Sequence, residues 1–81
     1  MEITFSRHAR RRMRLYKVDE YDVTETVNTY EANNLLTTGR YEVINKQLIE
    51  KYGYPLKVVY QKENTGIVVI TAYPVRKGRR L

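Results

Sequence analysis

One stretch, residues 56–73, limits the possible folds of this chain more than any other. It reads LKVVYQKENTGIVVITAY, with two runs of β-branched and aromatic residues on either side of a short polar break. This pattern is typical of a β-hairpin. The break fits a three-residue loop of Asn64, Thr65 and Gly66, in which Gly66 takes the left-handed conformation without a Cβ clash. The sequence therefore predicts two long antiparallel strands around which the rest of the chain packs.

The length of this loop decides which side chains share a face of the hairpin. If Glu63 pairs with Ile67, the two strands alternate in step and one face is entirely apolar. We expect this face to form the core, with Leu56, Val58, Tyr60, Val68, Ile70 and Ala72. The opposite face becomes more polar away from the turn, where Lys57, Thr71 and Tyr73 lie, and it is a candidate site. A four-residue loop would reverse the pairing of the faces.

The residues before the hairpin predict a strand, two helices and another strand. Residues 2–5 alternate apolar and polar side chains, as a short strand does. Ser6 can cap a first helix and Asp19 a second. The apolar stripes of the two helices are Phe5, Ala9, Met13 and Tyr16 in the first, and Val23, Val27 and Tyr30 in the second. Residues 40–45 are predicted to form the next strand.

Residues 45–53 allow two interpretations. The strand can continue through Leu48, before residues 52–55 turn the chain into the hairpin. Alternatively, a short helix begins with Asn45 as its cap and ends at Gly53. We favour the longer strand.

The order strand, helix, helix and three strands predicts an α+β domain. We expect a curved antiparallel sheet with both helices on one face and the other face open. Residues 1–81 make one domain, of which 75–81 form a basic tail. The chain has no cysteine, so neither a disulfide nor a thiolate metal site holds it together. Because no apolar run approaches the ~18 residues of a membrane span, we expect a soluble, cytoplasmic protein with no membrane partner.

Positive charge is concentrated near the two ends of the chain. Fifteen Lys and Arg against nine Asp and Glu give a net charge of +6. This charge favours RNA or DNA as the partner, while a solvated basic surface, an anionic membrane or an acidic protein such as an antitoxin are alternatives. The residues expected to bind nucleic acid are Arg7, Arg11, Arg14, Arg40, Lys57, Arg76, Lys77, Arg79 and Arg80.

His8 is the only histidine in the sequence, and it lies among arginines at the start of the first predicted helix. The helix N-terminus and the neighbouring cations disfavour the imidazolium form, so we expect His8 to be able to accept a proton. Arg12, one turn later on the same face, can hold a phosphate beside it. A surface histidine without a chemical role is the alternative.

Other reaction types lack the residues that they need. The nine carboxylates show no spacing typical of a two-metal nuclease, and one histidine without cysteine cannot form a zinc site. Phosphodiester cleavage without a metal or cofactor remains possible, and it needs a base, an acid and cations that stabilise the charge on phosphorus. The residues that supply these groups are His8, Tyr73, Arg12, Lys57 and Arg76.

The chain contains eight tyrosines, a number that fits a surface on which nucleobases stack. Most of them must be structural. We assign Tyr16, Tyr30 and Tyr60 to the core and Tyr73, just before the basic tail, to the site.

Two motifs resemble a known family. The opening His8-Ala9-x-x-Arg12-Met13 and the ending Val-Ile-Thr-Ala-Tyr, closing at Tyr73, resemble a bacterial family of unknown function that is related to the RelE-like toxin endoribonucleases. The resemblance implies a RelE-like α+β fold and metal-independent RNA cleavage under the control of an antitoxin. By motif, it assigns the catalytic function to His8, Arg12, Thr71 and Tyr73.

The chain departs from this family in two respects. Members usually carry Arg-Gly where it has Tyr16-Lys17. RelE-like toxins also use basic residues of the sheet and a C-terminal Tyr rather than a helical His, which leaves binding or positioning as the alternative role of His8.

Three hypotheses of different classes follow from the sequence. The first is a toxin-type endoribonuclease that cleaves RNA through attack of the 2′-hydroxyl. The second is a nucleic-acid-binding domain without catalysis. The third is a small protein-interaction module.

Overall fold

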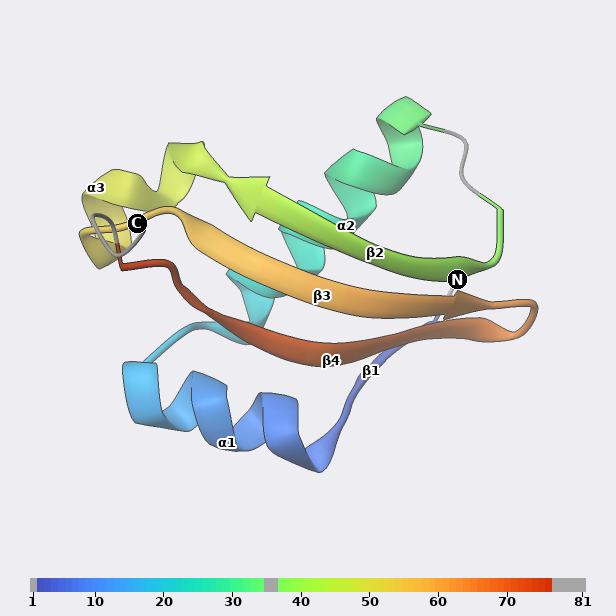
Figure 1. The fold of residues 1–81 in the computed structure, drawn as a ribbon, viewed down its shortest axis with the longest axis horizontal. Helices are drawn as coiled ribbons and strands as arrows, with labels where there is room; N and C mark the ends of the chain where they lie inside the picture. Colours follow the sequence, from blue (N-terminus) through green and yellow to red (C-terminus); the bar gives the residue numbers. More distant parts are fainter. Residues whose placement is uncertain (1, 35–36, 77–81) are drawn as a thin grey trace.

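A long hairpin forms the centre of the sheet in the computed structural model, which describes residues 2–34 and 37–76 (Figure 1). The described residues confirm the predicted α+β class. The elements in chain order are β1 (Glu2–Phe5), α1 (Arg7–Tyr16), α2 (Glu20–Asn34), β2 (Gly39–Asn45), the 3-10 turn η1 (Lys46–Leu48), α3 (Ile49–Tyr52), β3 (Leu56–Glu63) and β4 (Gly66–Pro74).

The four strands lie in the order β1-β4-β3-β2. β2, β3 and β4 are antiparallel neighbours, as predicted, but β1 pairs in parallel with β4, so the sheet is mixed rather than antiparallel. β1 occupies the edge of β4 that the hairpin leaves unpaired. The two strands approach closely at Gly66, where a Cβ would lie 2.9 Å from the carbonyl oxygen of Glu2. Gly66 is therefore required by strand packing, and it does not take the left-handed conformation that we expected.

The register of the hairpin corrects the sequence prediction. Glu63 pairs with Gly66, so the loop has two residues rather than three. A β-bulge then adds one residue to β4, because Tyr60 pairs with Val69 whereas Val59 pairs with Thr71. Beyond the bulge the pairing is the predicted one.

The bulge divides the predicted core set in two. Leu56, Val58, Tyr60 and Ala72 are fully buried, as expected. Near the turn, however, Ile67 and Val69 are in the core instead of Val68 and Ile70. A one-residue change in loop length exchanges the two faces of a strand, and the bulge exchanges them back.

Both predicted helices pack on this core face. α1 contributes Ala9 and Met13, and α2 contributes Val23 and Val27, to one hydrophobic cluster with the sheet. Figure 1 shows α2 crossing behind the sheet, while α1 continues from β1 along the side of β4. Tyr16 was expected in the core, but it is 43% exposed, so the buried stripe of α1 ends at Met13.

Ser6 fixes α1 against β4. Its side chain caps the helix by accepting a hydrogen bond from the Ala9 amide at 3.0 Å, as predicted. The same hydroxyl donates to the carbonyl of Ile70 at 2.9 Å, at the bulge. Lys17 ends the helix with a left-handed φ of 57°, a conformation that Gly adopts more readily.

Residues 45–53 form a helical turn, so the longer strand that we favoured is wrong and the alternative is confirmed. Asn45 accepts a hydrogen bond from the Gln47 amide at 3.0 Å, and Gly53 ends α3 with a φ of 83°. β2 stops at Asn45 because its partner there is Leu56, the first residue of β3. Further strand residues would have no neighbour with which to form hydrogen bonds.

Candidate nucleic-acid interface

Tyr73 is the centre of the candidate site. It pairs with Lys57 on the face of the sheet opposite the core. Arg12 reaches the same ring from α1, because this helix lies at the side of β4. The guanidinium carbon of Arg12 is 4.2 Å from the ring centroid of Tyr73, and the Nζ of Lys57 is 5.9 Å from it. The fold thus brings together three residues that the sequence analysis assigned to the site.

Tyr73 lines two adjacent hollows. One, the sheet groove, lies on the open face, measures about 440 Å³ and is lined by Arg40, Tyr41, Glu42, Lys57, Val59, Ile70, Thr71 and Tyr73. The other, the tyrosine pocket, measures about 530 Å³ and is lined by Arg12, Tyr16, Tyr52, Tyr54, Tyr73, Pro74 and Arg76. A ligand that binds across Tyr73 contacts both.

Two polar atoms beside Tyr73 are buried without a partner. Among the described residues, Arg12 Nε and Thr71 Oγ1 have no hydrogen bond and almost no exposed surface. Buried polar groups in folded proteins are nearly always hydrogen-bonded, and leaving one unpaired costs about 1–3 kcal/mol. Arg12 is the residue that stacks on Tyr73. Thr71 lies two positions before Tyr73 in the sequence. In the part of the chain that the structure describes, the buried side-chain atoms without a partner are therefore concentrated at the predicted site.

Lys57 provides a permanent positive charge in the sheet groove. Burial on its own lowers the pKa of this lysine, but the hydrogen bonds and charge interactions with Glu42 and Tyr73 together outweigh burial, so that the pKa lies above its usual value. The Nζ of Lys57 is 3.3 Å from a carboxylate oxygen of Glu42, and the side chain of Glu42 is mostly exposed. A surface pair of this kind is weak, so an incoming anion can compete for the ammonium group. Lys57 can stabilise charge but is not placed to act as a base.

His8 lies beside the site rather than in it. The residue is exposed on α1, one turn before Arg12, and neighbours at this spacing lie on the same side of a helix. It is not among the residues that line the sheet groove or the tyrosine pocket. Its role as proton acceptor stays a prediction.

The other predicted nucleic-acid-binding residues divide into three groups. Arg40 and Arg76 are exposed and line the sheet groove and the tyrosine pocket respectively. Three further predicted residues are arginines exposed along α1, and they are Arg7, Arg11 and Arg14. Three residues of the tail lie outside the described residues, and they are Lys77, Arg79 and Arg80.

Sequence reasoning missed three tyrosines of the tyrosine pocket. Tyr16 was assigned to the core, and Tyr52 and Tyr54 were treated only as part of a turn. The pairing of Leu56 with Pro74 provides the signal that was available, because it places the residues before β3 next to the end of β4. The predicted register already contained this pairing, but the pairing was not extended to Tyr54.

A polar network fixes the position of Tyr52. Its hydroxyl donates to the Asp22 carboxylate and accepts from the Asp19 amide at 3.1 Å. The Nζ of Lys51 lies 2.7 Å from carboxylate oxygens of both Asp19 and Asp22. Burial on its own raises the pKa of Asp22, but the hydrogen bonds from Lys51 and Tyr52 outweigh it and hold this pKa below its usual value. The network joins α3 to the start of α2 and so holds one wall of the tyrosine pocket.

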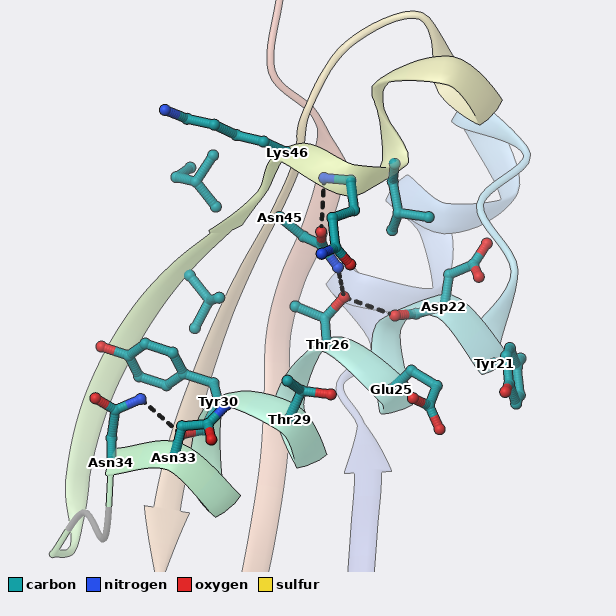
Figure 2. Close-up of a pocket in the computed structure, with 14 residues that line it drawn as sticks. Tyr21, Asp22, Glu25, Thr26, Thr29, Tyr30, Asn33, Asn34, Asn45 and Lys46 are labelled. Atoms are coloured by element: carbon teal, nitrogen blue, oxygen red, sulfur yellow. Dashed lines mark hydrogen bonds between the residues drawn. The ribbon is translucent and has the colours of Figure 1, made fainter.

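A further hollow, the α2–β2 groove, lies away from Tyr73 and measures about 520 Å³ (Figure 2). Three of its lining residues, Asp22, Thr26 and Asn45, are joined by hydrogen bonds. Asn45 Nδ2 donates to Thr26 Oγ1 at 2.9 Å, and Thr26 Oγ1 donates to the carbonyl of Asp22 at 2.8 Å. The carboxylates of Asp22 and Glu25 belong to its lining. This groove is therefore poorly suited to a polyanion.

The described residues contain no group of three or more His, Cys, Asp or Glu side chains placed to hold a metal ion. None of the helices in residues 2–34 and 37–76 is both long and apolar enough to cross a membrane.

The fold and the site define a small, basic α+β domain with an arginine- and tyrosine-lined surface. Over residues 5–74 the chain matches the family described as Domain of unknown function (DUF4258), and it belongs to that family. The matched segment contains His8, Arg12, Thr71 and Tyr73. Neither a curated protein nor a solved structure matches the chain. The relation to RelE-like toxins stays a prediction.

Proposed function

We propose that this domain binds single-stranded RNA across Tyr73 and cleaves it without a metal, as an endoribonuclease of the toxin type. One observation carries the proposal. Arg12 stacks on Tyr73 with its Nε buried and unpaired, and the Thr71 hydroxyl, two residues before Tyr73 on the same strand, is buried and unpaired as well. These atoms offer hydrogen bonds that the described part of the protein does not use.

The site has the two features that single-stranded nucleic acid requires. Arg12, Lys57 and Arg76 supply positive charge for successive phosphates, and their guanidinium and ammonium groups are donors only. The tyrosine rings supply flat surfaces, on which each stacked base contributes about 1–3 kcal/mol. Bases that are paired in a duplex cannot reach such surfaces, so a single strand is the expected form of the RNA.

Cleavage by this site uses the RNA's own 2′-hydroxyl as the nucleophile. The 2′-oxygen forms a bond to phosphorus, the bond from phosphorus to the 5′-oxygen breaks, and the 2′-hydroxyl proton passes to His8. Tyr73 donates a proton to the departing 5′-oxygen. Arg12 and Lys57 stabilise the charge that develops on the phosphate oxygens. The products are a 2′,3′-cyclic phosphate and a free 5′-hydroxyl.

The test is incubation of unstructured RNA with the folded protein in excess chelator, followed by analysis of the product ends. We expect cleavage to continue and to leave a 2′,3′-cyclic phosphate. His8→Ala should reduce the rate roughly 10² to 10⁴-fold and leave RNA affinity nearly unchanged, as expected when only proton transfer is lost. A full rate in His8→Ala would remove His8 from the mechanism.

A second candidate function is RNA binding without catalysis. The observation that favours it is the position of His8, which is exposed and outside the lining of both hollows. Salt-dependent RNA binding by the folded protein, with no cleavage after long incubation, would establish this function instead.

The proposed setting is the cytoplasm, where the RNA is found, with an acidic antitoxin as the controlling partner. Its negative charge would neutralise the arginines of α1 and the site. An acidic small reading frame directly beside the gene is the expected sign of such a partner. If a protein encoded there neither binds the domain nor slows cleavage, the toxin assignment loses its support.

A further inference from the structure

We propose that the tyrosine pocket holds one guanine base of the RNA, turned out of its stack beside the phosphate at Tyr73. This inference rests on the proposed function, because it concerns the same site and adds the identity of a base. Tyr73 lines both the tyrosine pocket and the sheet groove. A nucleotide whose phosphate lies in the sheet groove therefore places its base next to the pocket.

The walls of the pocket suit the flat faces of a base. Four tyrosines and Pro74 line about 530 Å³, which is room for one base and part of its sugar. Tyr52 is held in place by Asp22 and Asp19. Tyr54 is 36% exposed at the rim and is not part of the hydrophobic core. The arrangement gives a fixed wall at Tyr52 and an accessible ring at Tyr54, against which a base can stack.

The hydrogen-bonding groups of the pocket select among the four bases. Its charged lining residues are Arg12 and Arg76, and no carboxylate or carboxamide lies among its described lining residues. A guanidinium group only donates hydrogen bonds. Guanine presents two acceptors on one edge, O6 and N7, which arginine binds with two parallel hydrogen bonds. Adenine and cytosine present an amino donor at the corresponding position, and that donor would face another donor.

Uracil is a weaker match for the same pocket. It presents one carbonyl acceptor on this edge rather than two, and its single ring covers less of the tyrosine walls. Arg76 lines the pocket and is exposed, so its guanidinium group is the donor available to the two acceptors of guanine. Guanine is therefore the base that satisfies the most groups of the pocket.

The test measures binding of short 2′-deoxy oligonucleotides to the full-length folded protein at one fixed salt concentration. Because these strands lack the 2′-hydroxyl, binding is measured apart from cleavage. The strands are identical except for one central base. We expect the guanine strand to bind at least about 5-fold more tightly than the adenine or cytosine strand, which is the lower limit for a good bidentate contact.

Two variants locate the effect. Tyr54→Ala should weaken binding of the guanine strand by about 5-fold or more, through loss of stacking. Tyr21→Ala is the matched control, because Tyr21 is 71% exposed and lines the α2–β2 groove instead. It should leave both affinity and base preference unchanged.

The outcomes separate this inference from the proposed function. Equal affinity for all four strands, or a preference for adenine, cytosine or uracil, overturns the guanine pocket. If the guanine preference survives Tyr54→Ala but is lost in Tyr21→Ala, the guanine site is not in the tyrosine pocket. If the guanine preference is found but ordinary RNA is not cleaved, the inference stands and the catalytic part of the proposed function fails. If RNA is cleaved but no base is preferred, the proposed function stands and the guanine pocket fails.

Discussion

The tyrosine pocket and the α2–β2 groove are nearly equal in volume, at about 530 and 520 Å³, but they differ in chemistry. In the α2–β2 groove, Asn45, Thr26 and the Asp22 carbonyl satisfy one another. In the tyrosine pocket, Arg12 keeps a buried Nε without a partner. The comparison teaches that two hollows of equal volume can differ in unsatisfied hydrogen-bonding capacity, and this difference singles out the tyrosine pocket as the candidate site.

The difference follows from how the two hollows are built. The α2–β2 groove lies between two elements that follow each other in the chain, and short polar side chains join them. The tyrosine pocket is formed where α1, the turn after α3 and the end of β4 meet. Residues far apart in sequence supply its walls.

The largest expected contrast concerns a single hydroxyl group in each hollow. Tyr73→Phe should reduce RNA cleavage roughly 10² to 10⁴-fold with little change in affinity, because the ring remains and the proton donor is lost. Tyr30→Phe removes the equivalent hydroxyl from the lining of the α2–β2 groove and should leave the rate unchanged. Single-turnover cleavage assays measure both. Equal effects of the two changes would remove the distinction between the hollows.

A smaller contrast concerns one positive charge in each hollow. Arg12→Ala should weaken RNA binding and reduce the magnitude of the salt slope by about one, through loss of one phosphate contact. Lys46→Ala removes a cation from the α2–β2 groove and should leave the slope unchanged. Binding titrations at several salt concentrations provide the measurement. An affinity that does not depend on salt would contradict the whole electrostatic argument.

Stability and function should respond in opposite ways in the two regions. Thr71→Val replaces an unpaired buried hydroxyl with a methyl group, so the free energy of unfolding should stay equal or rise by up to about 1 kcal/mol while RNA binding weakens. Asn45→Ala removes the cap of η1 and the partner of Thr26, so stability should fall by about 1 kcal/mol while RNA binding is kept. Denaturant unfolding and RNA titrations of both variants test the pair. A Thr71→Val protein that is clearly less stable would show that the hydroxyl is satisfied in solution.

The smallest expected effect is a dependence of stability on pH. The folded state lowers the pKa of Asp22 below its usual value of 3.8, so this group stabilises the fold above that pH, and its contribution is lost as the pH falls through the lowered value. The melting temperature should therefore decrease from about pH 6 to about pH 3 more in the wild type than in Asp22→Asn. Glu25→Gln, which changes an exposed carboxylate of the same helix, is the control and should behave as the wild type. If the melting temperature changes with pH equally in Asp22→Asn and in the wild type, the Asp22 network does not contribute to the loss of stability in acid.

The local elements of this protein were predictable from sequence because their signals are local. The two strands of the hairpin, the Ser6 cap and the apolar stripe of α2 depend on residues a few positions apart, and the structure confirms them. Arg12 and Tyr73 were assigned to the site from their motifs, and the structure places them in contact.

Only the tertiary structure decided the register of the hairpin, the parallel pairing of β1 and the assembly of the tyrosine pocket. A two-residue loop and the bulge at Ile70 together leave four of the six predicted core residues in place and exchange the other two, because side chains in a strand alternate with a period of two. Tyr52, Tyr54 and Arg12 meet only because α1 and α3 pack at the end of β4. Such long-range packing depends on the sum of many contacts across the chain, and no short stretch of sequence carries that sum.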